Sequence, residues 1–444
     1  MYTDNFYLTE ALKGIRQGKY TASDLLERAL KRIDNCESVI RALLSEENRE
    51  KRLTERVKKL DKKYRKERAL SPQSDLYGVP IGVKDIFHVD KLPTRAGSRI
   101  DPELLTAEEG GAVKALRKAG ALVLGKTVTT EFAYYAPGPT RNPCNPDHTP
   151  GGSSSGSAAA VSAGYCPLAL GSQTIGSVIR PAAFCGITGF KPSYERISRE
   201  GMMDFSPSVD HVGFFTRDVS SIRPAAKVLL SDWKPQKDTG DIHREVKLGI
   251  PDTAYLDQAE EEGRHLFHKN IKRLQSTGLE IKELSILENI EEINELHKKL
   301  VAREFAVVHR KRYREHGDLF RPESEELLKR GQKVSEEDSK RARKRRLNLR
   351  GEISTVIKEK SIDGILSLSA PGPAPEGIDD TGDPVMNLPW TYAGVPVVSI
   401  PSAFSEKGLP VGLQIAVPYG EDEKLITLGE KIEKFFGENK KDRQ

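Results

Sequence analysis

The chain has 444 residues, of which 37% are hydrophobic and 30% charged, so it can bury a substantial core and does not have the composition of a disordered protein. Its 70 basic and 65 acidic residues leave a net charge of only +5, which gives no reason to expect a nucleic-acid partner. No run of about 18 apolar residues occurs, so no membrane-spanning segment is expected. The first residues lack the basic and apolar regions of a signal peptide, and we expect a cytoplasmic protein.

Cysteine and histidine give no sign of a disulfide framework or a metal centre. The sequence has four cysteines, at Cys36, Cys144, Cys166 and Cys185. They form no C-x-x-C pair, so we interpret them as reduced thiols. The closest histidines, His265 and His268, lie in a charged helical stretch without an obvious acidic ligand. We expect neither a metal nor another cofactor.

Residues 1–70 have the hydrophobic spacing of helices. Apolar residues recur every three or four positions through 8–18 and again through 21–33, where Thr21 or Ser23 can cap the helix. Basic residues dominate 51–68, which we interpret as the solvent-facing side of a helix.

Residues 71–245 contain short apolar segments separated by glycine and proline. Strands are expected at 77–87, 121–127 and 167–172, and an alanine-rich helix at 157–164. Strands that alternate with helices indicate a sheet with substantial parallel pairing.

Residues 246–358 predict a mainly helical excursion. After one strand at 246–251, the stretch 257–358 is rich in Glu, Lys and Arg and poor in glycine and proline. Strand patterns return in 359–444 before a final amphipathic helix. The expected fold class is therefore α/β: one domain over 1–444 with a large, mixed, mostly parallel sheet, flanked by helices and interrupted by a helical insertion.

Two short motifs match known patterns but lack the structural context that those patterns need. Gly120–Thr127 fits the phosphate-loop pattern G-x-x-x-x-G-K-[ST], yet its variable positions 121–124 are apolar and form the strand itself. Gly152–Gly156 fits the nucleophile elbow G-x-S-x-G around Ser154, yet prolines stand where an apolar strand must precede it. We therefore expect neither nucleotide binding nor an α/β-hydrolase site.

Three further segments carry the most specific pattern in the chain. They are GVPIGVKDIF with Lys84, GGSSSGSAAAVSAG with Ser153, and PLALGSQTIGSVIRPAAFCG with Ser177. Together they resemble the amidase signature family, and weaker similarity extends to NLPWTYAGVPVVSIP near the C-terminus. The two serines are 24 positions apart, as in the family's catalytic pair. The resemblance implies the amidase signature fold and hydrolysis of carboxamides, and it favours the free-standing amidases.

The residue types fit this chemistry. Amide hydrolysis needs a nucleophile, a base, an acid for the leaving amine and donors for the oxyanion. The three segments contain no histidine, and a lysine can replace it when neutral. Lys84 follows the apolar Pro80, Ile81 and Val83, and burial lowers the pKa of a lysine. The alternative is a partly buried lysine paired with Asp85.

The resemblance also implies individual roles. Ser177 would be the nucleophile, Ser153 would relay its proton, and Lys84 would be the final base. A cis peptide bond is implied between Gly152 and Ser153. The implied oxyanion hole consists of the amides of Thr174, Ile175, Gly176 and Ser177, with Gly176 letting the backbone approach the substrate.

Two positions depart from the family pattern. Ile175 stands where many members have glycine, and the chemistry should survive because the hole uses backbone groups. The family's arginine follows the nucleophile by two residues, whereas Arg180 follows Ser177 by three. No structural role is therefore carried over to Arg180.

Aromatic residues near these segments predict the substrate contacts, namely Tyr134, Tyr135 and Trp390. Glu131 is the only charge in the segments that carry them, so we expect hydrophobic or aryl amides as substrates and slow turnover of glutamine. An oxyanion hole accepts a carbamate carbonyl equally well, which leaves a carbamate hydrolase as an alternative. A glutaminase subunit of a tRNA-dependent amidotransferase and a non-enzymatic binding module are the others.

The expected partner is a small-molecule amide or carbamate. The basic run at 340–350 is interpreted as a solvated helix face, so neither nucleic acid nor a membrane is expected to bind. The sequence leaves a homodimer open.

Overall fold

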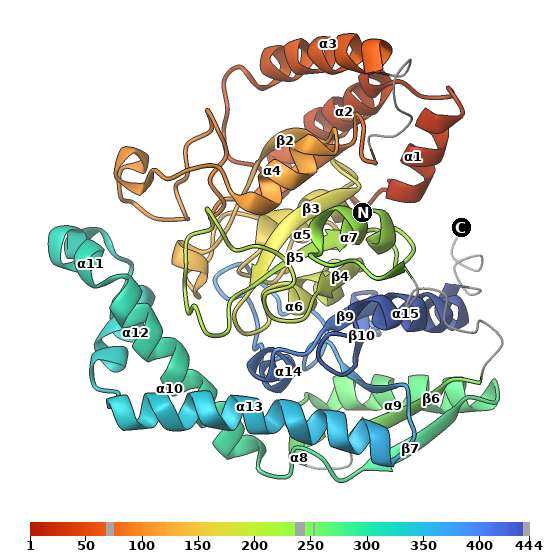
Figure 1. Ribbon diagram of the computed structural model, residues 1–444, viewed down its shortest axis with the longest axis vertical. Coiled ribbons are helices and arrows are strands. Elements are labelled where there is room, and N and C mark those ends of the chain that lie inside the picture. The colour runs from red at the N-terminus through yellow and green to blue at the C-terminus, as the bar shows by residue number, and fades with distance from the viewer. Residues whose placement is uncertain (68–74, 236–244, 252–253, 438–444) are drawn as a thin grey trace.

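The computed structural model describes residues 1–67, 75–235, 245–251 and 254–437, and its described part is built on one ten-stranded sheet (Figure 1). The strand order is β2-β1-β3-β5-β4-β9-β10-β8-β6-β7. The strands are β1 (Pro80–Lys84), β2 (Leu122–Thr127), β3 (Leu168–Gln173), β4 (Thr188–Lys191), β5 (His211–Thr216), β6 (Lys247–Pro251), β7 (Glu280–Leu284), β8 (Gly364–Leu368), β9 (Val397–Phe404) and β10 (Pro410–Ala416). The α/β class and the large mixed sheet are confirmed.

The prediction that the sheet is mostly parallel is wrong. The pairs at its two ends, β2-β1-β3 and β8-β6-β7, are parallel, whereas every pair from β3 across to β8 is antiparallel. A tight turn at 405–409 joins β9 to β10, and a turn of that length can only reverse the chain. Sequence alternation of strands and helices did not reveal this antiparallel centre.

The N-terminal helices pack at the β2 end of the sheet (Figure 1). They are α1 (Leu8–Arg16), α2 (Ala22–Ile40) and α3 (Arg49–Glu67). Of the two expected caps, Thr21 is used: its hydroxyl accepts from the amide of Asp24, whose carboxylate accepts from the amide of Thr21. Among the basic side chains of α3 that are described, Lys51, Lys58, Lys59 and Lys62 are exposed, and Arg49, Arg52 and Arg56 are partly buried. The side chains of the predicted run from 63 to 68 lie outside the described ones. The predicted boundary at 70/71 lies outside the described residues.

The other helices are α4 (Gly111–Lys118), α5 (Ser155–Ser162), α6 (Ile179–Phe184), α7 (Ile222–Leu229), α8 (Ala254–Asp257), α9 (Glu261–Ser276), α10 (Ile290–Val308), α11 (Arg310–His316), α12 (Pro322–Gln332), α13 (Glu336–Glu359), α14 (Leu388–Ala393) and α15 (Asp422–Gly437). Of these, α5, α6, α9 and α15 pack on the sheet, whereas α10 to α13 pack on one another and on α14 (Figure 1). Short 3-10 helices occur at Pro102–Leu105, Glu131–Ala133 and Gly317–Leu319. In the described part of the chain, no helix is both long enough and apolar enough to cross a membrane.

The excursion contains one strand that the sequence pattern missed. β7 lies within the stretch expected to be helical and pairs in parallel with β6 at the edge of the sheet. Its sequence EIKEL leaves the charged residues fully or partly exposed, and only Leu284 is buried. An edge strand with charged side chains does not show the apolar run of a central strand, which explains the miss.

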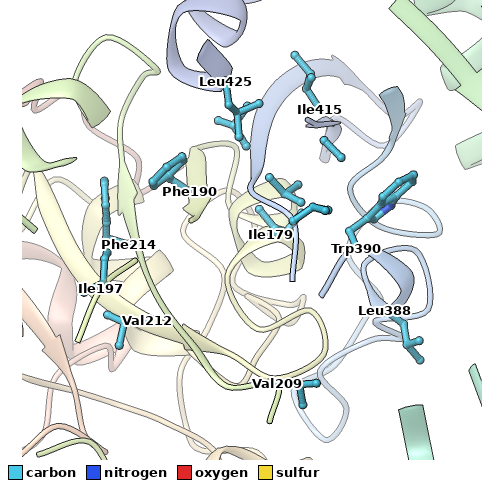
Figure 2. Close-up of a cluster of buried hydrophobic side chains, with 14 of the residues drawn as sticks. Ile179, Phe190, Ile197, Val209, Val212, Phe214, Leu388, Trp390, Ile415 and Leu425 are labelled. Carbon is cyan, nitrogen blue, oxygen red and sulfur yellow. The ribbon is translucent and has the colours of Figure 1, made fainter. Parts of the chain in front are cut away.

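The hydrophobic core lies between the sheet and its helices. Figure 2 shows part of it, where Ile179 of α6 lies among Phe190 of β4, Phe214 of β5 and Trp390 of α14. Phe190 and Phe214 stack at a tilt with ring centroids 5.3 Å apart. This packing fixes α6, and with it the turn that precedes the helix, against the middle of the sheet.

Candidate active site

Lys84 is the last residue of β1, and its side chain is fully buried. Its Nζ atom donates to Ser153 Oγ at 2.7 Å and to Ser172 Oγ at 2.8 Å. Burial lowers the pKa of Lys84 well below the ordinary value of 10.5, and the Asp210 carboxylate opposes this only in part. The two hydroxyls therefore surround an amine whose neutral form is favoured.

The alternative pairing of Lys84 with Asp85 does not occur. Asp85 forms a buried ion pair with Lys126 at 2.7 Å instead, and its carboxylate also accepts from the amide of Arg95. Lys126 belongs to the phosphate-loop-like motif, but it lies at the end of β2 and also donates to Thr94 Oγ1. The lysine of the motif thus forms an ion pair with the carboxylate of the residue that follows Lys84. The motif itself is a strand, as expected.

Ser153 and Ser154 lie in the loop before α5 and play different structural parts. Ser153 follows the cis Gly152–Ser153 peptide bond and faces Lys84. Ser154 is fully buried, and its hydroxyl contacts the backbone amide and carbonyl of Ser172. No strand precedes this loop within 134–154, so the elbow-like motif lacks an elbow.

Ser177 lies in the turn between β3 and α6, and it is 9% exposed, compared with 2% for Ser153. Its hydroxyl makes no hydrogen bond to another described residue. Gln173 holds the turn, because its Oε1 accepts from the amides of Val178 and Ile179 at 2.8 and 2.9 Å. Ser177 is thus held in a rigid turn with its hydroxyl free for a ligand.

Arg180 connects the two serine loops. Its fully buried guanidinium donates to the carbonyl of Gly152 at 2.8 Å and to Thr381 Oγ1 at 3.2 Å, and it also donates to the carbonyl of Gly382. Its backbone amide donates to the carbonyl of Gly176. One arginine therefore joins the Ser153 loop, the Ser177 turn and the loop at 380–384.

Two polar groups of this site were missed by sequence reasoning. Ser172 precedes Ser177 by five residues and comes next to Lys84 because β1 and β3 are parallel neighbours, with Val83 opposite Leu170. Asp210 is fully buried, accepts from Thr174 Oγ1 at 2.6 Å, and has its pKa raised to about 6 by burial. Only knowledge of the strand pairing could have indicated Ser172.

The predicted oxyanion residues lie directly before Ser177. Ile175 is partly exposed, whereas Thr174 and Gly176 are buried. A Cβ atom on Gly176 would lie 2.4 Å from Asn387 Oδ1, so the close approach that requires glycine here is to α14 and its preceding loop.

A cavity of about 370 Å³ opens beside Ile175, and it contains two of the three predicted substrate contacts, Tyr134 and Tyr135. The two rings meet edge to face with centroids 4.7 Å apart. The charged residues of the lining are Lys298, Arg330, Asp380 and Asp383. No ion pair joins any two of them in the described structure, so their charges remain available to a bound molecule.

Two expectations about this pocket are wrong. Trp390 is fully buried, donates to the Tyr255 hydroxyl, and lies in the apolar core rather than in the cavity lining (Figure 2). Glu131, expected to be the only charge, is turned away and accepts from the amide of Arg321. Aromatic residues next to a site in sequence can equally well face the core, and the cavity's charges come from segments far away in the chain.

The described residues contain no group of three or more metal-ligating side chains. In the basic run at 340–350, Arg341, Arg343 and Arg345 form ion pairs with Glu292, Glu304 and Glu352. Much of the positive charge on this face of α13 is therefore compensated within the protein.

The fold and the site together place a buried lysine against two serine hydroxyls on an α/β sheet. The model of the family described as Amidase matches residues 24–426, and the chain therefore belongs to the amidase family. It is thus an amidohydrolase of the amidase signature type.

Similar proteins cover almost the whole chain. One relative is a component of the glutamyl-tRNA(Gln) amidotransferase of Exiguobacterium sibiricum, which is 31% identical over 94% of this chain and 95% of its own. A crystal structure described as an amidase superimposes with a TM-score of 0.87 at 33% identity, over 97% of this chain and 100% of its own. The peptide amidase of Stenotrophomonas maltophilia shares the fold, with a TM-score of 0.80 at 22% identity over 97% of each chain.

Arg180→Lys is expected to lower kcat/KM about tenfold or more, because an ammonium group cannot reproduce the planar fork that reaches three acceptors. Arg32→Lys is the matched control, because Arg32 also donates to two backbone carbonyls, those of Tyr2 and Ala163. These two carbonyls lie outside the site. Steady-state kinetics and thermal unfolding of both variants test this. Wild-type activity in Arg180→Lys would show that the linkage of the loops is dispensable.

Proposed function

We propose that this chain hydrolyses the C–N bond of a carboxamide through an acyl-enzyme intermediate on Ser177. The observation that carries the proposal is the contact of the buried Lys84 Nζ with Ser153 Oγ at 2.7 Å, with no carboxylate bonded to that amine among the described residues. A neutral amine in this position can accept a proton that a serine hydroxyl passes on.

In the proposed reaction, Ser177 Oγ attacks the carbonyl carbon while its proton passes to Ser153 and the proton of Ser153 passes to Lys84. The backbone amides before and at Ser177 stabilise the oxyanion. The C–N bond then breaks, and the amine leaves with the proton returned from Lys84 through Ser153. Water then attacks the acyl-enzyme while its proton passes through Ser153 to Lys84. That proton returns through Ser153 to Ser177 Oγ as the acyl C–O bond breaks, which releases the carboxylic acid and restores Ser177.

For the substrate, we propose a small carboxamide that carries charged groups. Lys298 and Arg330 supply positive charge to the cavity, and Asp380 and Asp383 supply negative charge. All four side chains are solvent-exposed at the mouth of the cavity, where a substrate with complementary charges can form ion pairs with them. Tyr134 and Tyr135 still provide area for an aryl group, so hydrophobic or aryl amides and carbamates belong in the comparison.

A glutaminase subunit of an amidotransferase is the second candidate function. Glutamine carries both an ammonium and a carboxylate beside its carboxamide chain, and these match the mixed charges of the cavity lining. The similarity to amidotransferase components supports the same candidate. A self-sufficient hydrolase turns over its amide without a partner protein, and size-exclusion chromatography with a glutaminase assay separates the two.

A fluorophosphonate is expected to label Ser177, because that serine is more exposed than Ser153 and Ser154 and lies beside the cavity-lining Ile175. Mass spectrometry of the digested adduct identifies the residue. Ser177→Ala should abolish labelling, whereas Ser154→Ala should keep it. An adduct on Ser154 would refute the proposed nucleophile.

The rate is expected to rise with pH and to level off above the pKa of Lys84, because only the neutral amine accepts a proton. Since burial places that pKa well below 10.5, the rise should be complete before pH 10.5. Lys84→Met and Lys84→Arg should each lower kcat by about 10² to 10⁴, because neither side chain takes up a proton. Lys126→Arg is the control and should retain the rate. A Lys84→Arg variant of normal activity would place the base elsewhere.

A carboxamide that bears an ammonium and a carboxylate, such as glutamine, is expected to exceed a matched aryl amide and aryl carbamate in kcat/KM by about tenfold or more. Lys298→Met and Asp383→Asn should remove this preference and leave the aryl substrates unaffected, since only the charged substrate uses those groups. A preference for the aryl amide that both variants retain would contradict the charged-substrate proposal.

A further inference from the structure

The oxyanion loop contains three successive peptide groups whose carbonyls are each bonded to a different element. The carbonyl of Thr174 contacts His297 Nε2 of α10 at 3.0 Å. The carbonyl of Ile175 accepts from Thr391 Oγ1 of α14 at 2.6 Å, and that of Gly176 accepts from the amide of Arg180 in α6 at 3.0 Å. Each carbonyl of the loop is therefore held from outside the loop.

This arrangement determines where the amides point. In a trans peptide the C=O bond and the N–H bond of the following residue are antiparallel, and the peptides of this loop are trans. The amides of Ile175, Gly176 and Ser177 thus point away from α10, α14 and α6. None of the three donates a hydrogen bond to another described residue, as expected of donors reserved for an oxyanion.

The first of these contacts defines the state of His297. A carbonyl only accepts, so Nε2 must carry the proton. The ring is fully buried, burial lowers its pKa to about 3, and it packs edge to face against Tyr392 with centroids 5.4 Å apart. His297 is therefore a neutral donor of fixed orientation at neutral pH. Thr174 is held on its other side by Asp210, which accepts from its hydroxyl.

We propose that His297 is a positioning residue for the oxyanion hole, which it orients by holding the Thr174 carbonyl so that the Ile175 amide faces the reacting carbonyl. This rests on the proposed function of Ser177. It also gives the helical excursion a part in the reaction, because Lys298 and Val301 of the same helix line the substrate cavity. Helix α10 thus contributes both to the oxyanion hole and to the pocket.

Two substitutions separate this role from simple packing. His297→Phe keeps an aromatic ring against Tyr392 but removes the donor. His297→Gln places an amide nitrogen near the position of Nε2 and keeps a donor.

His297→Phe is expected to lower kcat by about 10- to 100-fold with KM within about twofold, since a misdirected donor costs less than the 10² to 10³ of a removed one. His297→Gln should recover most of the loss, and the midpoint of the pH–rate profile should stay unchanged because Lys84 is untouched. Wild-type kcat in His297→Phe, or an equal loss in His297→Gln, would overturn the proposal.

The rate of fluorophosphonate labelling provides a readout independent of the substrate. His297→Phe should label more slowly than wild type and His297→Gln at close to the wild-type rate, with both variants folded by circular dichroism. Failure of the wild-type protein to label at Ser177 would instead refute the proposed function. Equal labelling of wild type and His297→Phe would refute the role of His297 alone.

Discussion

The site depends on burying a lysine without giving it a carboxylate. An amine removed from water favours its neutral form unless a negative charge compensates for the lost hydration. Lys84 meets this condition because its hydrogen-bond partners are hydroxyl groups, because Asp85 is already paired with Lys126, and because the Asp210 carboxylate offsets the effect of burial only in part. The Asp85 carboxylate is thus compensated by Lys126 rather than by Lys84.

The remaining architecture brings distant segments to this amine. Parallel pairing of β1 and β3 places Ser172 beside Lys84 and positions the turn that carries Ser177. Arg180 then joins that turn to the Ser153 loop. Buried guanidinium groups that satisfy several carbonyls are well suited to such connections, because their five donors have a fixed planar geometry.

The helical excursion contributes the remaining part of the site. α10 contributes the donor to Thr174 and part of the cavity wall, and Glu304 of the same helix accepts from Ser206 and Ser208, close to the buried Asp210. The charged helical excursion and the α/β core, which differ most in composition, therefore meet at the candidate active site. The excursion supplies the cavity's positive charges, and the loop at 380–384 supplies its negative ones.

Much of the fold and the three central segments could be predicted from the sequence, because glycine- and serine-rich loops and apolar strands are local patterns. The match to the family model confirms the predicted family, and the strand order confirms the predicted mixed α/β sheet. The sequence could not predict the antiparallel centre of the sheet or the parts played by Ser172 and His297, because these depend on which strands and helices become neighbours. Trp390 shows the same limit: proximity in sequence does not tell whether an aromatic ring faces the cavity or the core.

The central claim is that Lys84 is neutral when the enzyme works, and its pKa can be measured directly. Lysine labelled with ¹³C at Cε can be titrated by NMR in the Ser177→Ala protein, with Lys84→Met used to assign the Lys84 signal. We predict that this signal titrates well below 10.5, the ordinary value for lysine. A Lys84 signal that titrates at or above 10.5 would contradict the account.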